Sequence, residues 1–164
     1  MLPSMATKQE TILVLGLGNI LLSDEAVGVR VLEYLETHHA SETDALKLMD
    51  GGTMGLTLLV DMEDADALVI IDAAVLGKEP GAIQVFEGHD MDHFLRNRGR
   101  SPHDIGLDDL MDGLRLREAL PERRALVGIE PRILTVGESL TDDVAAAVPK
   151  AAKIIIDLVK RWNS

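Results

Sequence analysis

Five apolar residues followed by an acid, ALVIID at residues 67–72, make the most strand-like stretch of this sequence. Their side chains do not alternate with polar ones, which is typical of a strand buried on both faces of a parallel sheet. Asp72 ends the run, and a carboxylate there must be solvated, paired or bound to a metal, because burying it alone is costly. A functional role and an ordinary salt bridge at a strand end both fit Asp72.

Shorter apolar runs on either side of this stretch predict further strands, separated by helical patterns. Such alternation is typical of βαβ units, in which a largely parallel sheet carries helices on both faces. We therefore predict an α/β fold, a single three-layer αβα domain with a mainly parallel, twisted sheet of about five strands. Residues 1–10 would form a disordered tail, and residues 11–164 the domain. The other predicted strands cover residues 12–15, 46–49, 83–86 and 124–129.

The helices are predicted from apolar residues at helical spacing and from capping residues. Ser23 or Asp24 could cap the first helix, and Asp104 could cap a later one. The last helix should begin near residue 141, and Pro149 should kink or split it, because proline removes a backbone donor. Residues 87–104 carry no convincing period and are predicted to form a polar loop.

Composition narrows the class of protein. A chain of 164 residues suffices for one domain with a full core, and the 2% aromatic content makes that core aliphatic. The net charge of −12 would repel nucleic acids and anionic membranes. The absence of cysteine removes thiolate sites and disulfides and fits a reducing compartment. The apolar run at residues 11–22 is shorter than the roughly 20 residues of a membrane span, so we predict a cytoplasmic monomer.

The topology itself suggests a site. In a doubly wound sheet, ligands bind beyond the carboxyl ends of the strands, and Glu25, Asp72 and His103 all fall there. Two carboxylates and an imidazole suit a borderline divalent metal such as Ni, Zn, Co or Mn, and ligand type alone does not choose among them. Taken singly, Glu25 could be an ordinary first-turn acid and His103 an exposed loop histidine.

Two other patterns compete with that site. Gly16 and Gly18 follow the first strand as in a dinucleotide-binding fingerprint, but position 21 is leucine where the pattern needs a third small residue. The simpler interpretation is that both glycines allow a tight turn. His89 and His93 could lie on one side of a helical turn as metal ligands, but little apolar surface anchors such a turn, which favours a solvated loop.

Four stretches of the chain occur together in a recognisable order: GLGNILLSDE at 16–25, DGGT at 50–53, VIIDA at 69–73 and SPH at 101–103. Together they closely resemble the hydrogenase maturation endopeptidases, and the similarity runs from about residue 11 to the final helix. The resemblance implies metal ligands at Glu25, Asp72 and His103, and a further acid at Asp50 that either supports the ligands or takes part in catalysis.

The resemblance also implies an activity. Such an endopeptidase removes a short C-terminal extension from the precursor of a nickel-iron hydrogenase large subunit after nickel insertion. Nickel would arrive in the precursor as the recognition signal, although other divalent metals could occupy the site. Asp50 or Asp72 would act as general base, and Arg96, Arg98 and Arg100 could help to bind the precursor. The alternatives are a nickel carrier or assembly chaperone with the same ligands, and a nucleotide-binding domain.

Overall fold

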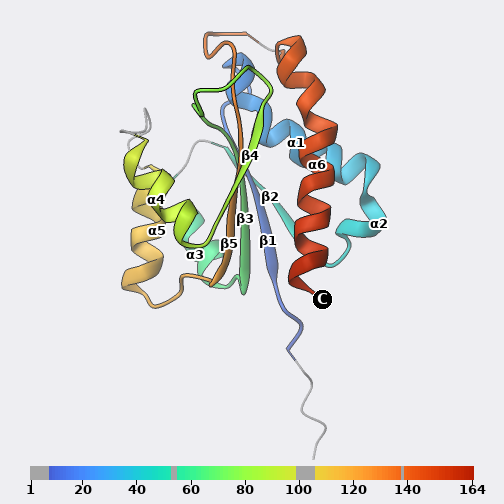
Figure 1. Ribbon diagram of the computed structural model, residues 1–164. Coiled ribbons are helices and arrows are strands. Elements are labelled where there is room, and N and C mark those ends of the chain that lie inside the picture. The colour runs from blue at the N-terminus through green and yellow to red at the C-terminus, as the bar shows by residue number, and fades with distance from the viewer. Residues whose placement is uncertain (1–7, 53–54, 99–105, 138) are drawn as a thin grey trace, which may run out of the picture.

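The five strands form one sheet, in the order β2-β1-β3-β5-β4 (Figure 1). The computed structural model describes residues 8–52, 55–98, 106–137 and 139–164. Within these residues β1, β2, β3 and β5 run parallel, and β4 pairs antiparallel with β5. The predicted α/β fold with a mainly parallel sheet is confirmed. The strands are β1 (Ile12–Leu17), β2 (Leu46–Gly52), β3 (Ala67–Ala73), β4 (Ile83–Glu87) and β5 (Arg123–Ile129).

Helices cover both faces of this sheet and complete the three layers (Figure 1). The long helices α1 and α6 pack on one face and contact each other, while α3, α4 and α5 lie on the other. The bounds are η1, a 3-10 turn (Ser23–Ala26), α1 (Val27–His38), α2 (Ala40–Thr43), α3 (Thr57–Glu63), α4 (His89–Asn97), α5 (Leu107–Leu116) and α6 (Asp142–Trp162).

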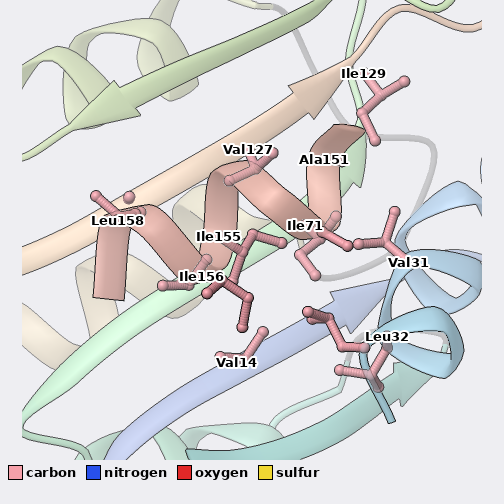
Figure 2. Packing of buried hydrophobic residues seen from close by; sticks show 14 of the residues in the cluster. Val14, Val31, Leu32, Ile71, Val127, Ile129, Ala151, Ile155, Ile156 and Leu158 are labelled. Atoms are coloured by element: carbon pink, nitrogen blue, oxygen red, sulfur yellow. The ribbon is translucent and has the colours of Figure 1, made fainter. Parts of the chain in front are cut away.

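The uninterrupted apolar strands contribute side chains to two separate hydrophobic cores, because successive side chains of a strand point to opposite faces of the sheet. Val14 and Ile71 face the α1 and α6 side, where they meet Val31 and Ile155 (Figure 2). Leu15 and its alternating neighbours face α3, α4 and α5. Central strands that are covered twice in this way are rigid supports for whatever lies at their ends.

The predicted loop at residues 87–104 is wrong in its first part, where α4 covers His89–Asn97. Met91 and Leu95 are buried against the sheet, and the Phe94 ring stacks on Phe86 with ring centroids 4.2 Å apart. These residues recur at helical spacing. The sequence interpretation missed this helix because polar residues lie among these apolar ones, and one of them, Asp92, faces inward.

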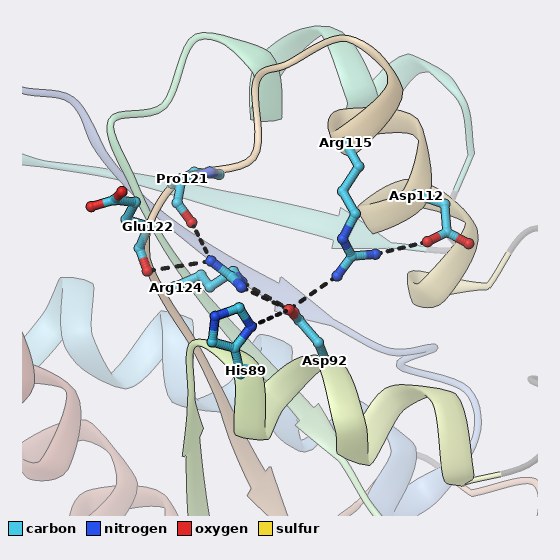
Figure 3. Close-up of polar contacts among 7 residues, drawn as sticks. All are labelled: His89, Asp92, Asp112, Arg115, Pro121, Glu122 and Arg124. Carbon is cyan, nitrogen blue, oxygen red and sulfur yellow. Dashed lines mark hydrogen bonds and ion pairs between the residues drawn. The ribbon is translucent and has the colours of Figure 1, made fainter.

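Asp92 is held by a buried ion pair that joins α4 to β5 (Figure 3). Arg124 donates to its two carboxylate oxygens, from Nε at 3.0 Å and from Nη2 at 2.7 Å. Arg115 of α5 adds a contact from Nη2 at 3.1 Å. Burial raises the pKa of Asp92, but the hydrogen bonds and charge of Arg124, followed by those of Arg115, outweigh burial and leave it below its usual range. One acid thus links two helices to the sheet.

Two predictions about helix ends and breaks are also corrected. Pro149 lies inside α6, which is one helix of 21 residues, so the predicted split of this helix does not occur. Proline is tolerated there because the buried apolar stripe of α6 holds the helix on the sheet. The N-cap of α5 is Gly106, whose N–H donates to the Asp109 carboxylate at 2.9 Å. Asp104, the predicted cap, lies outside the described residues.

No helix in the part of the chain that the structure describes is both long enough and apolar enough to cross a bilayer.

Candidate active site

Two acids, Asp50 and Asp72, lie near the carboxyl ends of strands β2 and β3. Asp50 lies near the end of β2 as the register partner of Gly16 in β1, and on the other side of Gly16 lies Ile71, the residue before Asp72 in β3. Two strand spacings, about 10 Å, therefore separate the backbones that carry Asp50 and Asp72. Both strands run past their predicted ends, so these acids belong to the sheet rather than to loops.

Glycines bring Glu25 to the same place. A Cβ on Gly18, whose φ is 127°, would overlap the carbonyl oxygen of Glu25. A Cβ on Gly28 would overlap the carbonyl oxygens of Leu17 and Ile71. The glycine-rich segment thus lets η1 and α1 lie directly against the ends of β1 and β3. This supports the tight-turn interpretation of Gly16 and Gly18.

Asp72 is a largely buried acid with a raised pKa. Its side chain is 14% exposed, and burial raises its pKa to about 7. The Arg98 guanidinium, with Nη1 3.9 Å from Asp72 Oδ2, and the N–H of Ala73 only partly oppose burial, while the neighbouring Glu25 carboxylate raises the pKa further. Asp72 can therefore hold or release a proton near neutral pH, as a general acid or base must.

The Glu25 carboxylate lies near enough to Asp72 to influence its charge, and Asp50 lies across β1 from Asp72. Asp50 is exposed, and its Oδ1 accepts a hydrogen bond from the Gly52 N–H at 2.7 Å. His103 lies outside the described residues, so its predicted place at the site stays a prediction. Arg100 also falls outside them, whereas Arg98 contacts the site directly.

The rival histidine pair does lie on one helix. In α4 the His89 side chain is fully exposed, with Nδ1 3.7 Å from Asp92 Oδ2, and His93 Nδ1 lies 3.4 Å from the side-chain amide of Asn97. Within residues 8–52, 55–98, 106–137 and 139–164, no three acidic or histidine side chains gather closely enough to hold a metal ion.

Asp24, which precedes Glu25, was missed as part of the site. It is fully buried and accepts hydrogen bonds from the N–H groups of Arg132, Ile133 and Thr141 at 2.7–2.9 Å. Burial raises its pKa, but these backbone hydrogen bonds together outweigh burial and leave the pKa below its usual value. The Thr141 hydroxyl donates to both carboxylate oxygens. Asp24 therefore fixes η1, and with it Glu25, to the chain between β5 and α6.

Asp24→Asn is expected to destabilise the fold by about 1–3 kcal/mol at pH 7, because an amide cannot accept all of these hydrogen bonds. The lowered pKa means that the stabilisation by Asp24 is present above its unfolded pKa and is lost as pH falls through the folded value. Urea unfolding at pH 7 and at pH 3 measures both effects. If the free energy of unfolding differs between variant and parent by the same amount at pH 7 and at pH 3, the lowered pKa of Asp24 is contradicted.

The chemistry of this edge is that of a carboxylate pair. Glu25 and Asp72 lie close enough for one charge to disfavour the other, and a divalent cation relieves such repulsion. Two carboxylates could supply part of the ligand set of a borderline divalent ion. Asp50 is exposed and lies across β1 from Asp72. In this arrangement one carboxylate can bind a cation while another accepts a proton.

Comparisons with known proteins agree in sequence and in structure. A family model described as hydrogenase maturation protease matches residues 29–158. The chain is 40% identical to the hydrogenase 2 maturation protease of Escherichia coli K12 over 146 residues, covering 88% of each chain. It is 35% identical to the hydrogenase expression/formation protein HupD of Rhodobacter capsulatus, covering 96% of this chain and 75% of the relative. The solved structure of the hydrogenase maturating endopeptidase HybD from E. coli matches with a TM-score of 0.82 and 36% identity, covering 92% and 93% of the two chains.

Proposed function

Because this chain belongs to the hydrogenase maturation protease family, we propose that it cuts the C-terminal extension from the precursor of a nickel-iron hydrogenase large subunit after nickel insertion. Nickel is part of the substrate in this proposal, held by the precursor when the two proteins meet. The observation that carries the proposal is the Glu25–Asp72 carboxylate pair at the carboxyl edge of the sheet, with the pKa of Asp72 raised to about 7.

The side chains have separate tasks. Glu25 and Asp72, with His103 as the third ligand implied by the family resemblance, bind the nickel of the precursor and so bring the scissile bond to the sheet edge. Bound metal supplies polarisation of a carbonyl or activation of a water. Asp50 is the better candidate for general base, because Asp72 has a ligand role to fill and Asp50 is exposed across β1 from it. Arg98 orients Asp72 through their ion pair.

The test is the intact mass of a nickel-loaded precursor after incubation with this protein, beside the same precursor without nickel. Loss of the C-terminal peptide is expected in the loaded sample only. Glu25→Gln and His103→Ala should weaken binding of the loaded precursor as well as its cleavage, whereas Asp50→Asn should retain binding and lose cleavage. A loaded cognate precursor whose mass never changes would contradict the peptidase proposal and favour a nickel carrier or assembly chaperone that uses the same ligands.

A further inference from the structure

The outer edge of the sheet at β4 has backbone groups that face away from β5. The N–H of Gly88 donates to the carbonyl of Arg124, and the N–H of Glu130 donates to the carbonyl of Ala82, each at 2.9 Å. In an antiparallel pair, bonded and non-bonded residues alternate along the strand. These two hydrogen bonds, one at each end of β4, therefore fix the alternation for the whole strand.

The alternation divides β4 into two sets of residues. Gln84 and Phe86 turn their N–H and C=O groups toward β5, while Ile83, Val85 and Glu87 turn theirs toward the outer edge. β4 is the last strand of the sheet, and all five of its residues are partly exposed. An edge of this kind can pair with one more extended chain.

A groove of about 500 Å³ runs along this strand, between β4 and α4. Its apolar part contains the stacked rings of Phe86 and Phe94 and the Val75 side chain, which is 73% exposed. Its polar part contains His93 and Asn97 of α4. Such a lining, apolar with a few polar groups, is typical of ligand sites.

The groove leads to the carboxylate site. Arg98 lines it and also pairs with Asp72, Nη1 to Oδ2 at 3.9 Å. Gln84, at the same end of β4, lies opposite Gly128 of β5, and Gly128 lies opposite Asp72 of β3. A chain paired with the edge at Gln84 would therefore lie about three strand spacings, roughly 14 Å, from Asp72.

We propose that the outer edge of β4 binds the C-terminal segment of the precursor as an added β-strand, so that alternate side chains of the segment enter the groove beside α4. This inference rests on the proposed function, which requires a peptide substrate at the site. An extended polypeptide is the ligand that can satisfy the N–H and C=O groups of Ile83, Val85 and Glu87 together. A second copy of this chain is disfavoured, because each copy carries a net charge of −12.

The first test uses hydrogen exchange of the backbone amides with a synthetic peptide of the precursor's C-terminal segment as the probe. Binding should slow exchange of the Ile83, Val85 and Glu87 amides by about tenfold or more, since they gain partners. The Gln84 and Phe86 amides should change little, because they already bond to β5. Uniform protection along β4, or none at saturating peptide, would overturn the added-strand proposal. A concentration-dependent dimer with the same alternating pattern in the absence of peptide would assign the edge to self-association instead.

The second test compares two variants of one outward-facing residue. Val85→Pro removes the N–H that would meet the substrate without removing a bond to β5, and proline is tolerated at a sheet edge. Val85→Ala keeps the N–H and reports the loss of side-chain packing alone. Val85→Pro should raise KM for the nickel-loaded precursor about tenfold more than Val85→Ala does, with little difference in kcat between them.

The two variants and the parent protein together separate the two proposals. If the parent cleaves the precursor and both variants show the same KM, the edge is not the binding site although the function stands. If the parent does not cleave, the function fails, and the exchange pattern with the peptide still decides whether the edge binds an extended chain. Circular dichroism of Val85→Pro shows whether the variant is folded, and hydrogen exchange on the parent protein decides the matter if it is not.

Discussion

Asp72→Asn is expected to lower kcat/KM for the loaded precursor by about 10²–10⁴-fold, the range that a positioned proton-transfer group or metal ligand supplies. The amide has the same shape, so the end of β3 keeps its packing while losing the charge that binds a cation and the group that titrates near neutrality. The measurement is the time course of precursor cleavage by intact mass. Asp66→Asn is the matched control, because Asp66 directly precedes the same strand at its opposite end, where its carboxylate accepts from the Thr11 N–H. Equal losses in both variants would show a general effect of charge rather than a site.

The same substitution has a second, opposite effect on the free protein. The folded pKa of Asp72, about 7, lies above the ordinary value of 3.8, so the folded state favours the protonated acid. Its contribution to stability is therefore fully present below about pH 4 and is lost as pH rises through 7. Asp72→Asn should be more stable than the parent at pH 8, by about 4 kcal/mol at most, and nearly equal to it at pH 4. Urea unfolding at the two pH values measures the difference. A variant less stable than the parent at pH 8 would contradict the raised pKa.

Asp92→Ala is expected to lower the free energy of unfolding by about 3–5 kcal/mol, because it leaves the Arg124 guanidinium buried without its counter-charge. The carbonyls of Pro121 and Glu122 accept from Arg124 Nη1 at 2.9 and 3.4 Å, and these neutral partners cannot replace a carboxylate. Urea unfolding at pH 7 measures the loss. The double variant Asp92→Leu with Arg124→Met should recover much of it, since both charges leave the interior together.

A matched control for this ion pair exists on α6. Lys153 and Asp157 form a pair one helical turn apart, with Nζ 2.7 Å from Oδ1 and both side chains more than half exposed. Asp157→Ala should cost less than about 1 kcal/mol, because solvent screens such a pair. Similar losses at Asp92 and Asp157 would mean that the α4 ion pair is not the buried link between helix and sheet. Asp92→Ala should also weaken precursor cleavage, because loosening α4 would displace Arg98, which follows the end of α4 and pairs with Asp72.

The parts of the fold that could be predicted depend on contacts between near neighbours. Uninterrupted aliphatic runs such as residues 67–71 identify central parallel strands, and the ends of those strands identify Asp72 and Glu25. Helix α4 was missed because its inward-facing Asp92 pairs with Arg124, 32 residues away, and sequence spacing does not show that partner. Asp24 was missed for the same reason, since its partners lie more than a hundred residues later. A hydrophobic pattern therefore fails to identify polar side chains that are buried because they pair with residues far away in the sequence.

The partners of Asp24 have a consequence for the order of events during synthesis. Its contact with Thr141 spans 117 residues, and Thr141 is the N-cap of the last helix. Contacts between such distant parts of a chain close slowly, and a nascent chain emerges from its amino end. β1, β2 and β3 can therefore assemble while Glu25 still lacks its support. The support of Glu25 should therefore be complete only after the segment that contains Thr141 has left the ribosome and folded.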